Sequence, residues 1–348
     1  MPDLDNTDKK LLTLIQKEFP LEPQPYAALS ARLGIEEDEV LQRLRRLKEQ
    51  KILRQVSAIF DTKSLGYLSS LVAVRVAPER VDEAARIINE HPGVSHNYKR
   101  NNLFNIWYTI AVPPTSSLEA TVNRLHELTG AESTRLMPTL HLFKIGVNLD
   151  MTGEESIVSR GEPQYSQERR DEALQHAVTE EEIAIIREVQ KDLDIVPHPF
   201  RPMAERLGCS EEELIQKITE LQRIGHLRRF AAILYHRRAG YAANGMGVWK
   251  VDAEKAKEIG DQMATFNAVS HCYLRPTYPD WHYNVFTMIH GHKVKDCEEV
   301  AKAISEATGV GEYMMLYSTK EYKKIRLSYY GREFEAWEAK YLDKAPVH

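Results

Sequence analysis

The chain contains two copies of one sequence pattern, and this internal repeat restricts the fold more than any other feature. The clearest matches are Val94-Ser95-His96-Asn97-Tyr98 with Val269-Ser270-His271-Cys272-Tyr273, Gly66-Tyr67 with Gly240-Tyr241, and Thr129-Gly130 with Thr308-Gly309. The offset grows only from 174 residues (66 to 240) to 179 residues (129 to 308), so the insertions are the size of loops. A solenoid needs about three repeats or more, so two copies predict a pseudo-two-fold pair within one chain.

The first part of each copy has the pattern of a winged helix-turn-helix. In the first copy a short helix over Ala27–Leu33 is followed by Gly34, which favours a helix end. Apolar residues at i, i+1, i+4 and i+7 within 40–47 form one face of a further helix. The partly alternating segment Leu53–Phe60 then predicts the β-strand of a wing.

The second part of each copy changes to a β-α-β-β-α-β order, which is typical of a ferredoxin-like domain. The expected strands of the first copy are Leu71–Val76, Val94–Lys99, Ile106–Val112 and Leu136–Gly146, with helices over Glu79–Asn89 and up to Gly130. We therefore predict an α+β fold, a tandem duplication of a winged helix-turn-helix plus a ferredoxin-like (βαββαβ) domain. The predicted boundaries are 1–62 and 63–150 for the first copy, 151–177 for a solvated linker or a strap over the surface, 178–236 and 237–330 for the second copy, and 331–348 for a C-terminal tail.

Charge and cysteine content exclude several classes of protein. A net charge of -5 argues against a protein that coats nucleic acid nonspecifically. Cys209, Cys272 and Cys297 include no C-x-x-C pair, which excludes a disulfide framework and a cysteine zinc site. The first residues lack the pattern of a signal peptide, and no apolar run approaches the ~18 residues of a membrane span. We expect a cytoplasmic protein with no membrane partner.

A triplet of polar residues, repeated in both copies, is the strongest candidate site. His96, Tyr98 and Arg100 recur at period two, so a strand would present all three on one face. The second copy has the same triplet, which consists of His271, Tyr273 and Arg275. One such triplet could simply be a polar sheet edge, but its presence in both copies favours a site. These residue types suit proton transfer, hydrogen bonding and carboxylate binding.

The order of domains resembles the Lrp/AsnC family of transcription regulators, as does the opening pattern Leu4-Asp5-x-x-Asp8-x-x-Leu11-Leu12. This resemblance implies a DNA-binding, ligand-sensing regulator as one alternative. The recognition helices, however, begin with Glu36-Glu37-Asp38-Glu39 and Ser210-Glu211-Glu212-Glu213. These carboxylates would face the phosphates of DNA, although acidic first turns also suit the helix dipole. We therefore expect no specific DNA binding.

Several motifs, in order along the chain, are similar to the siroheme decarboxylase family of Lrp/AsnC-like enzymes. They are V-S-H-x-Y-x-R in both copies, Phe104-Asn105-Ile106-Trp107-Tyr108-Thr109, Phe143-Lys144-Ile145-Gly146-Val147, Tyr283-Asn284-Val285-Phe286-Thr287 and the segment 316–324. The resemblance covers about residues 5–330. It implies a fused form of two related subunits, an intrachain pseudo-dimer, and it leaves a further homo-oligomer open.

The resemblance also implies a reaction. The family removes carbon dioxide from the acetate side chains on rings C and D of siroheme to give 12,18-didecarboxysiroheme, for an alternative haem route or haem d1 synthesis. No cofactor is required, because the iron enters as part of the substrate. A proton donor that titrates near neutrality is expected, which favours histidine. A haem-binding sensor without turnover is a third alternative.

Roles for individual residues follow from this implied reaction. His96 and His271 are candidate proton donors, and either could instead be the axial ligand of the siroheme iron. Tyr98 and Tyr273 would bind the substrate or orient the histidines, and Arg100 and Arg275 would bind carboxylates. Further substrate-binding candidates are Trp107, Arg54, Arg228, Lys323 and Lys324, with Trp249 and Trp281 as possible stacking or core residues. No metal site formed by the protein alone is expected.

Overall fold

The two halves of the chain repeat one order of elements in the computed structural model, which describes residues 4–146, 158–161, 167–235 and 243–342. The first copy contains α1 (Asn6–Lys17), α2 (Pro25–Leu33), α3 (Glu37–Glu49), β1 (Leu53–Phe60), β2 (Leu68–Arg75), η1 (Pro78–Arg80), α4 (Val81–Asn89), β3 (Val94–Arg100), β4 (Ile106–Val112), α5 (Leu118–Thr129), β5 (Ser133–Pro138) and β6 (His141–Ile145). The rest contains α6 (Gln167–Ala173), α7 (Glu180–Val189), α8 (Arg201–Leu207), α9 (Glu211–Ile224), β7 (Leu227–Leu234), β8 (Ala243–Trp249), α10 (Ala256–Ala264), β9 (Val269–Leu274), β10 (Val285–Gly291), α11 (Val294–Thr308), β11 (Tyr313–Lys324) and α12 (Glu333–Tyr341).

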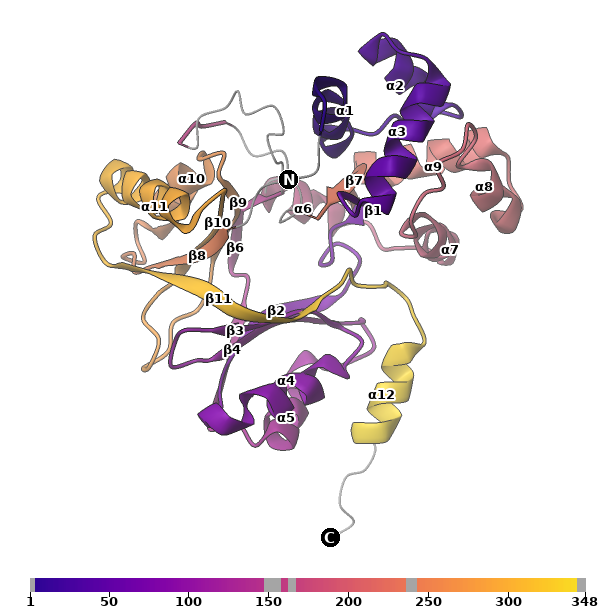
Figure 1. The fold of residues 1–348 in the computed structure, drawn as a ribbon. Coiled ribbons are helices and arrows are strands. Elements are labelled where there is room, and N and C mark those ends of the chain that lie inside the picture. Colours follow the sequence, from indigo (N-terminus) through magenta and orange to yellow (C-terminus); the bar gives the residue numbers. More distant parts are fainter. Residues whose placement is uncertain (1–3, 147–157, 162–166, 236–242, 343–348) are drawn as a thin grey trace.

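The two winged-helix parts share one hydrophobic core. The strand β1 pairs antiparallel with β7 of the other copy, with Ala58 opposite Phe230, so each wing strand pairs with its counterpart. The ring centroids of Phe19 in the first copy and Phe230 in the second are 5.8 Å apart, and both side chains are buried. Helices end where the sequence predicts, since Gly34 closes α2 at a φ of 69° that few residues other than glycine adopt. This pairing joins the two copies at one end of the molecule (Figure 1).

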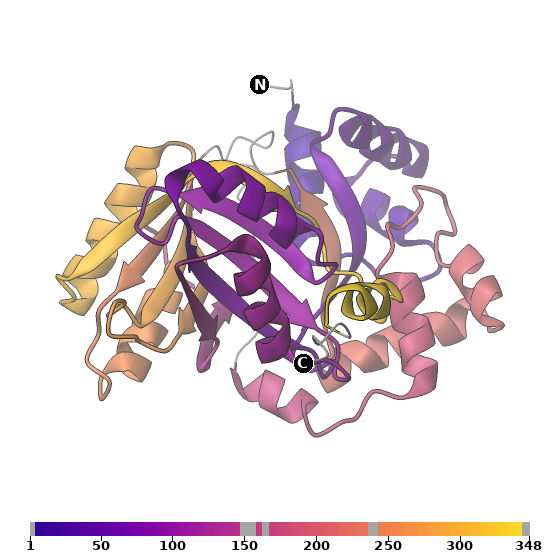
Figure 2. The same cartoon turned by 90° about the horizontal axis from the view of Figure 1, so that it is seen from below.

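Each copy forms a four-stranded ferredoxin-like sheet, as predicted. The strand order is β5-β2-β4-β3 in the first copy and β11-β8-β10-β9 in the second. The two orders are identical when each strand is matched with its counterpart in the other copy. Helices α4 and α5 cover the outer face of the first sheet, as Figure 2 shows for the purple elements, and α10 and α11 cover the outer face of the second. Gly240-Tyr241, part of the repeat, lies outside the described residues.

Strand exchange joins the two sheets into one sheet of nine strands. The long strand β11 pairs with β8 through Tyr313–Tyr317 and then with β3 of the other copy through Ser318–Lys324. In the first copy two separate strands have these two roles. The strand β5 pairs with β2 of its own copy, whereas β6 pairs with β9 of the other copy. The end of each copy thus completes the sheet of the other.

The inner faces of the two sheets pack against each other. Trp107 and Met137 of the first copy lie in the same buried cluster as Met246, Phe286 and Leu316 of the second. Burial of one large apolar side chain contributes about 1.5–3 kcal/mol to stability. This cluster therefore stabilises the packing of the two sheets against each other. The expected pseudo-dimer within one chain is therefore observed, and its inner faces enclose the site described below.

Two segments outside the copies differ from expectation. Part of the expected solvated linker forms α6, whose Arg170 is buried and donates to both carboxylate oxygens of Asp61 at 2.5–3.1 Å. The expected C-terminal tail forms α12, in which Phe334 is buried in the core shared by the winged-helix parts and Trp337 in the core of the first ferredoxin-like domain. The sequence did not predict either helix, because a few apolar or paired side chains suffice to dock a short helix. Residues 151–157, 162–166 and 343–348 lie outside the described part of the chain.

Candidate active site

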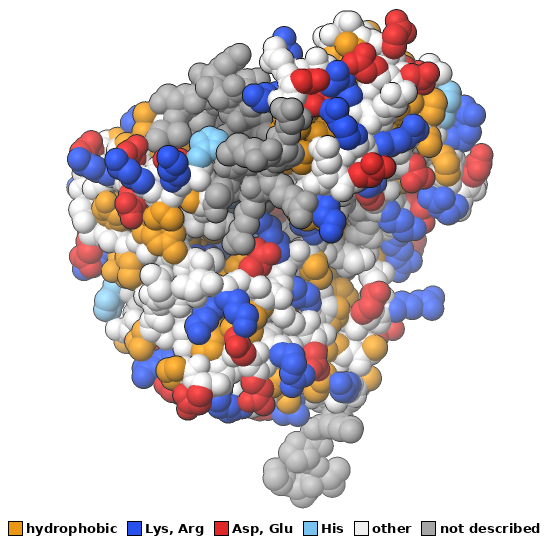
Figure 3. Space-filling view, viewed as in Figure 1, with side chains coloured by type: hydrophobic (Ala, Val, Ile, Leu, Met, Phe, Trp, Pro, Cys, Tyr) orange, Lys and Arg blue, Asp and Glu red, His pale blue; other side chains and the backbone are white. Residues whose placement is uncertain are grey.

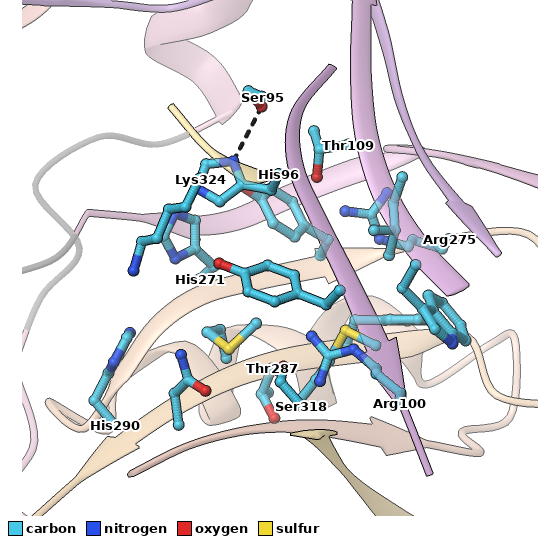
Figure 4. A pocket seen from close by; sticks show the side chains of 18 residues that line it. Ser95, His96, Arg100, Thr109, His271, Arg275, Thr287, His290, Ser318 and Lys324 are labelled. Atoms are coloured by element: carbon cyan, nitrogen blue, oxygen red, sulfur yellow. Dashed lines mark hydrogen bonds between the residues drawn. The ribbon is translucent and has the colours of Figure 1, made fainter. Parts of the chain in front are cut away.

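The strand β3 carries the first half of the site. His96, Tyr98 and Arg100 alternate along it, and all three side chains face the inner side of the sheet. A register shift between Val94 and His96 marks a bulge against β4, and Ser95 faces the same pocket as His96. Ser95 Oγ lies 3.0 Å from His96 Nδ1 (Figure 4). The irregular strand thus places a hydrogen-bond partner directly beside the histidine.

The strand β9 repeats this arrangement in the second copy. His271 and Tyr273 lie on the strand, Arg275 follows directly after its end, and all three face the pocket. A second register shift, opposite Met288 on β10, accompanies the histidine. Ser270 Oγ lies 2.8 Å from His271 Nδ1. The repeated sequence therefore produces a repeated geometry.

Both triplets line a single pocket between the two sheets. Its volume is about 340 Å³. The described lining residues, none of them acidic, are Leu71, Ser95, His96, Tyr98, Arg100, Trp107, Thr109, Asn244, Met246, His271, Tyr273, Arg275, Phe286, Thr287, Met288, His290, Ser318 and Lys324. The structure thus brings together the six residues of the two triplets, as the periodicity of the strands predicts.

Basic side chains lie toward two ends of the pocket. Figure 4 shows Arg100 and Arg275 toward one end. The side chains toward the other end are His96, His271, His290 and Lys324. Tyr98 and Tyr273 stand between histidine and arginine on their strands, so the phenol groups occupy the middle. A ligand with several negative charges would meet cations at both ends.

Arg100 and Arg275 are buried cations with unused hydrogen-bonding capacity. Nη1 of Arg100 donates to the Leu316 carbonyl at 2.7 Å, and Nη1 of Arg275 donates to the Met137 carbonyl. The Nε of each is buried without a partner among the described residues, and no described carboxylate forms a salt bridge with either. Burial lowers the pKa of both guanidinium groups to about 10, so both stay charged. A buried charge without a counter-ion is costly, which favours an anionic ligand here.

The two histidines are neutral in the free protein. Burial, with Lys324 and Arg54 nearby, lowers the pKa of His96 to about 4. Burial, with His290 next in effect, lowers the pKa of His271 well below its usual value. The expectation of a donor that titrates near neutrality is therefore wrong for the free protein, because desolvation and cationic neighbours disfavour the charged imidazolium. In both residues Nδ1 faces a serine, which leaves Nε2 for a ligand.

Aromatic side chains form one wall of the pocket. Trp107 lines it, and the indole Nε1 donates to the Phe104 carbonyl at 2.7 Å. Trp281 packs against Trp107 at 5.1 Å without lining the pocket. Trp249 lies in the core beneath α10 and α11, where it stacks on Tyr313 at 4.5 Å. Of the three tryptophans considered, Trp107 is therefore the one placed to contact a ligand.

The weaker cationic candidates divide into two groups. Lys324 lines the pocket, whereas Lys323 Nζ turns away and donates to the Asn89 carbonyl at 2.7 Å. Arg54 donates to the Lys324 carbonyl at 3.4 Å, and Arg228 donates to a carbonyl at the end of β1 at 3.2 Å. Neither arginine belongs to the described lining, but Arg54 lies near enough to His96, and Arg228 near enough to His271, to help lower the pKa of these histidines.

The polar lining residues that the sequence did not single out are Ser95, Thr109, Asn244, Thr287, His290 and Ser318. Ser270 is not among the described lining residues, but its Oγ lies 2.8 Å from His290 Nε2 and 2.8 Å from His271 Nδ1. The serine recurs in both copies, although the period-two pattern of the triplets gave no reason to assign it a role. The alternation of Phe286, Met288 and His290 along β10 is the signal that would have placed His290 on the inner face.

Comparisons with known proteins first define a class. The AsnC-like ligand binding domain matches residues 64–144 and 238–323. The siroheme decarboxylase NirDL-like HTH domain matches residues 8–54 and 182–228. Both matches occur twice and follow the repeat, so the fold is that of a tandem Lrp/AsnC-like protein. In the described ranges no three His, Cys, Asp or Glu side chains gather as a metal site would require, and no helix there could cross a membrane.

Whole-chain similarities then identify the family. The siroheme decarboxylase of Hydrogenobacter thermophilus is 40% identical over 335 residues, which cover 96% of this chain and 98% of that protein. The crystal structure of the siroheme decarboxylase NirDL has a TM-score of 0.74 and 35% identity, covering 97% of this chain and 99% of the other. A structure of NirDL in co-complex with an iron-uroporphyrin III analogue has a TM-score of 0.73 and 34% identity, with the same coverage. The chain belongs to the siroheme decarboxylase family.

Proposed function

We propose that this protein is a siroheme decarboxylase that removes carbon dioxide from the acetate side chains on rings C and D of siroheme. The observation that carries the proposal is the pair of buried arginines, Arg100 and Arg275, which lack a carboxylate partner in a pocket that two histidines also line. Siroheme bears many carboxylates, so it would supply the missing counter-ions. The similarity to NirDL, which binds an iron-uroporphyrin III analogue, supports the same kind of ligand.

The reaction needs an electron sink and a proton. When the bond between the acetate carbon and its carboxylate breaks, carbon dioxide leaves and the electron pair stays on the carbon. Transient protonation of the macrocycle beside the acetate would accept those electrons, and a carbon–hydrogen bond finally replaces the carbon–carbon bond. The exchange consumes one proton for each carbon dioxide released and is redox-neutral. We therefore infer that no redox cofactor is required and that iron enters with the substrate.

The pocket residues suit separate parts of this reaction. Arg100 and Arg275 would hold carboxylates in a fixed position through charge-assisted hydrogen bonds. Trp107 would pack against the apolar macrocycle, which also limits access of water. One of His96 and His271 would give the proton, and the other could ligate iron through neutral Nε2. Tyr98 and Tyr273 would orient the reacting acetate between them, and Arg54 and Arg228 would contribute positive potential at the edge.

Binding of the substrate would change the electrostatics of the histidines. In the free protein, cations surround His96 and His271 and keep both imidazoles neutral. Carboxylates that enter the pocket would neutralise Lys324 and the arginines, so that the histidines would no longer face uncompensated positive charge. The substrate would thus bring the counter-charge that the pocket lacks. The product, didecarboxysiroheme, would feed an alternative haem route or haem d1 synthesis.

The decisive experiment is anaerobic incubation of the purified protein with siroheme, followed by mass spectrometry of the tetrapyrrole. We expect the sequential loss of two carbon dioxide units. Binding without any change in mass would instead support a haem-binding sensor, and the enzyme proposal would be withdrawn. A boiled sample and the variant Arg100→Met/Arg275→Met serve as controls, because both should retain unconverted siroheme.

A further inference from the structure

The histidine end of the pocket departs from the pseudo-two-fold symmetry of the chain at one position. Strand pairing aligns β10 with β4 residue by residue, and His290 corresponds to Ala111. Ala111 has no polar side-chain atom. His290, in contrast, lines the pocket and is buried. One copy therefore has an extra imidazole that the other copy cannot replace.

This extra imidazole extends a hydrogen-bond chain to the site. Ser270 Oγ lies 2.8 Å from His271 Nδ1 and 2.8 Å from His290 Nε2, so the hydroxyl connects the two rings. Its distance to the Met288 carbonyl is longer, 3.3 Å, and this contact is the weaker competitor. In the first copy Ser95 Oγ meets His96 Nδ1 at 3.0 Å, and no second histidine of the described residues is hydrogen-bonded to that hydroxyl.

We propose that His290 is a positioning residue which acts through Ser270 to make His271, rather than His96, the proton donor of the reaction. The inference rests on the proposed function. A hydroxyl has one proton to give. When His290 donates its Nε2–H to Ser270, the serine proton is directed to His271 Nδ1, and His271 then carries its own proton on Nε2, toward the substrate.

The same chain explains how a neutral histidine can act as an acid. Burial keeps both His271 and His290 neutral, with the pKa of His290 lowered to about 4. A neutral imidazole that gives up Nε2–H would become an anion unless it gains a proton at Nδ1. Ser270 supplies that proton and takes one from His290 Nε2, and His290 must then be reprotonated at Nδ1. Every group is neutral again at the end, and each proton that reaches the substrate carbon is drawn ultimately from the medium.

The test uses variants that separate hydrogen bonding from packing. His290→Leu keeps the bulk and removes the bond, His290→Gln keeps an N–H donor, and Ser270→Ala breaks the chain at its centre. We expect His290→Leu and Ser270→Ala each to lower kcat for siroheme roughly tenfold to hundredfold, with KM and the absorption spectrum of bound siroheme unchanged. His290→Gln should recover part of the rate.

Two double variants make the inference sharp. Because Ser270 and His290 act in series, Ser270→Ala/His290→Leu should be no slower than either single variant. Ser95 belongs to the other copy, so the effects of Ser95→Ala and His290→Leu should multiply. A normal kcat in His290→Leu, or an altered spectrum with normal kcat, would overturn the inference. A wild type that never decarboxylates siroheme would overturn the proposed function instead, so the two failures are distinguishable.

Discussion

Lys324 lies opposite His96 where β11 crosses to β3. The corresponding position in the other copy, opposite His271, is Ile145 of β6. The residue paired with His96 across the sheet is therefore a cation, whereas the residue paired with His271 is apolar. The repeat supplies two similar histidine sites, and substitutions on the exchanged strands make their surroundings different. A substrate whose two reacting acetates lie on different rings could use this difference.

We expect His96→Ala and His271→Ala to have different effects. Loss of a proton donor should lower kcat about 10²–10⁴-fold with binding largely retained. Loss of an iron ligand should instead change the absorption spectrum of the bound tetrapyrrole and its affinity. Turnover of siroheme and the spectrum of the bound state should be measured for each variant.

His141 offers a control for these two variants. It packs on Phe143 at 4.7 Å and is not among the described lining residues, so His141→Ala should keep both rate and spectrum. Normal rates and spectra in both His96→Ala and His271→Ala would remove these residues from the mechanism. The decarboxylase proposal would then depend on family similarity and the arginines.

Removal of the buried arginine charges should weaken ligand binding without weakening the fold. Arg100→Met or Arg275→Met should each raise the Kd for an iron tetrapyrrole roughly tenfold to hundredfold, since hydrogen bonds to charged groups contribute about 1.5–3 kcal/mol. The thermal midpoint should stay or rise, because a buried charge without a counter-ion is destabilising. Absorbance titration and calorimetry measure the two effects.

Arg86→Met is the matched control, because Arg86 is exposed and, among the described residues, forms its salt bridge with Glu90, four residues further along the chain. This variant should alter neither affinity nor midpoint. A lower thermal midpoint with unchanged affinity in Arg100→Met or Arg275→Met would show that the guanidinium groups stabilise the sheet and do not bind the ligand. The carbonyl bonds to Leu316 and Met137 make this a genuine alternative.

Local features of the fold and site could be predicted from the sequence. Period-two spacing placed His96, Tyr98 and Arg100 on one face, and the β-α-β-β-α-β order predicted each sheet correctly. Both follow from residues close together in the chain, where backbone geometry decides. The repeat added the expectation of a pseudo-dimer, and the shared inner core agrees with it.

Long-range features could not be predicted in the same way. The crossing of β6 to β9 and of β11 to β3 depends on pairing between segments far apart in sequence, and alternation is satisfied equally well by pairing within one copy. The register shifts beside His96 and opposite Met288, which accompany the contacts of Ser95 and Ser270 with the histidines, also arise from pairing. The depressed pKa of His96 follows from burial and from Lys324, which the exchanged strand delivers.

We expect no specific binding of DNA in a gel shift at low salt. The first turn of α3 is acidic, and two of its four basic residues, Arg43 and Arg46, both pair with Asp8 of α1 at 2.5–2.9 Å. These arginines are therefore already neutralised. Acidic and basic side chains are interspersed over the winged-helix parts on the face in Figure 3, so phosphates would meet both charges.

Charge reversal tests this electrostatic argument. The variant Glu36→Lys/Glu37→Lys/Asp38→Lys should gain weak, salt-sensitive affinity for DNA of any sequence. Tight binding of DNA by the wild type, with an unchanged affinity in this variant, would contradict the electrostatic explanation. An equal number of substitutions on α12, away from the winged-helix recognition helices, controls for net charge alone.

The stability of the protein should fall as the pH is lowered from about 6.5, and His91 should account for part of that fall. His91 is buried against Trp337 at 4.4 Å, and its Nδ1 accepts the Gly93 N–H at 3.0 Å, which requires a neutral ring nitrogen. Burial lowers the pKa of His91 to about 3. Between that value and about 6.5 the unfolded chain binds a proton that the native protein does not.

The sign follows from this difference in bound protons. The free energy of unfolding should be largest above pH 6.5 and should decline, by at most about 1.4 kcal/mol per pH unit for His91, as the pH falls toward 3. His91→Gln retains a side-chain acceptor and cannot titrate, so its unfolding free energy in denaturant should fall less steeply with pH. His282→Gln, at an exposed position, should keep the wild-type slope. Equal slopes for His91→Gln and wild type would mean that other buried groups, His96 and His290 among them, dominate the acid sensitivity.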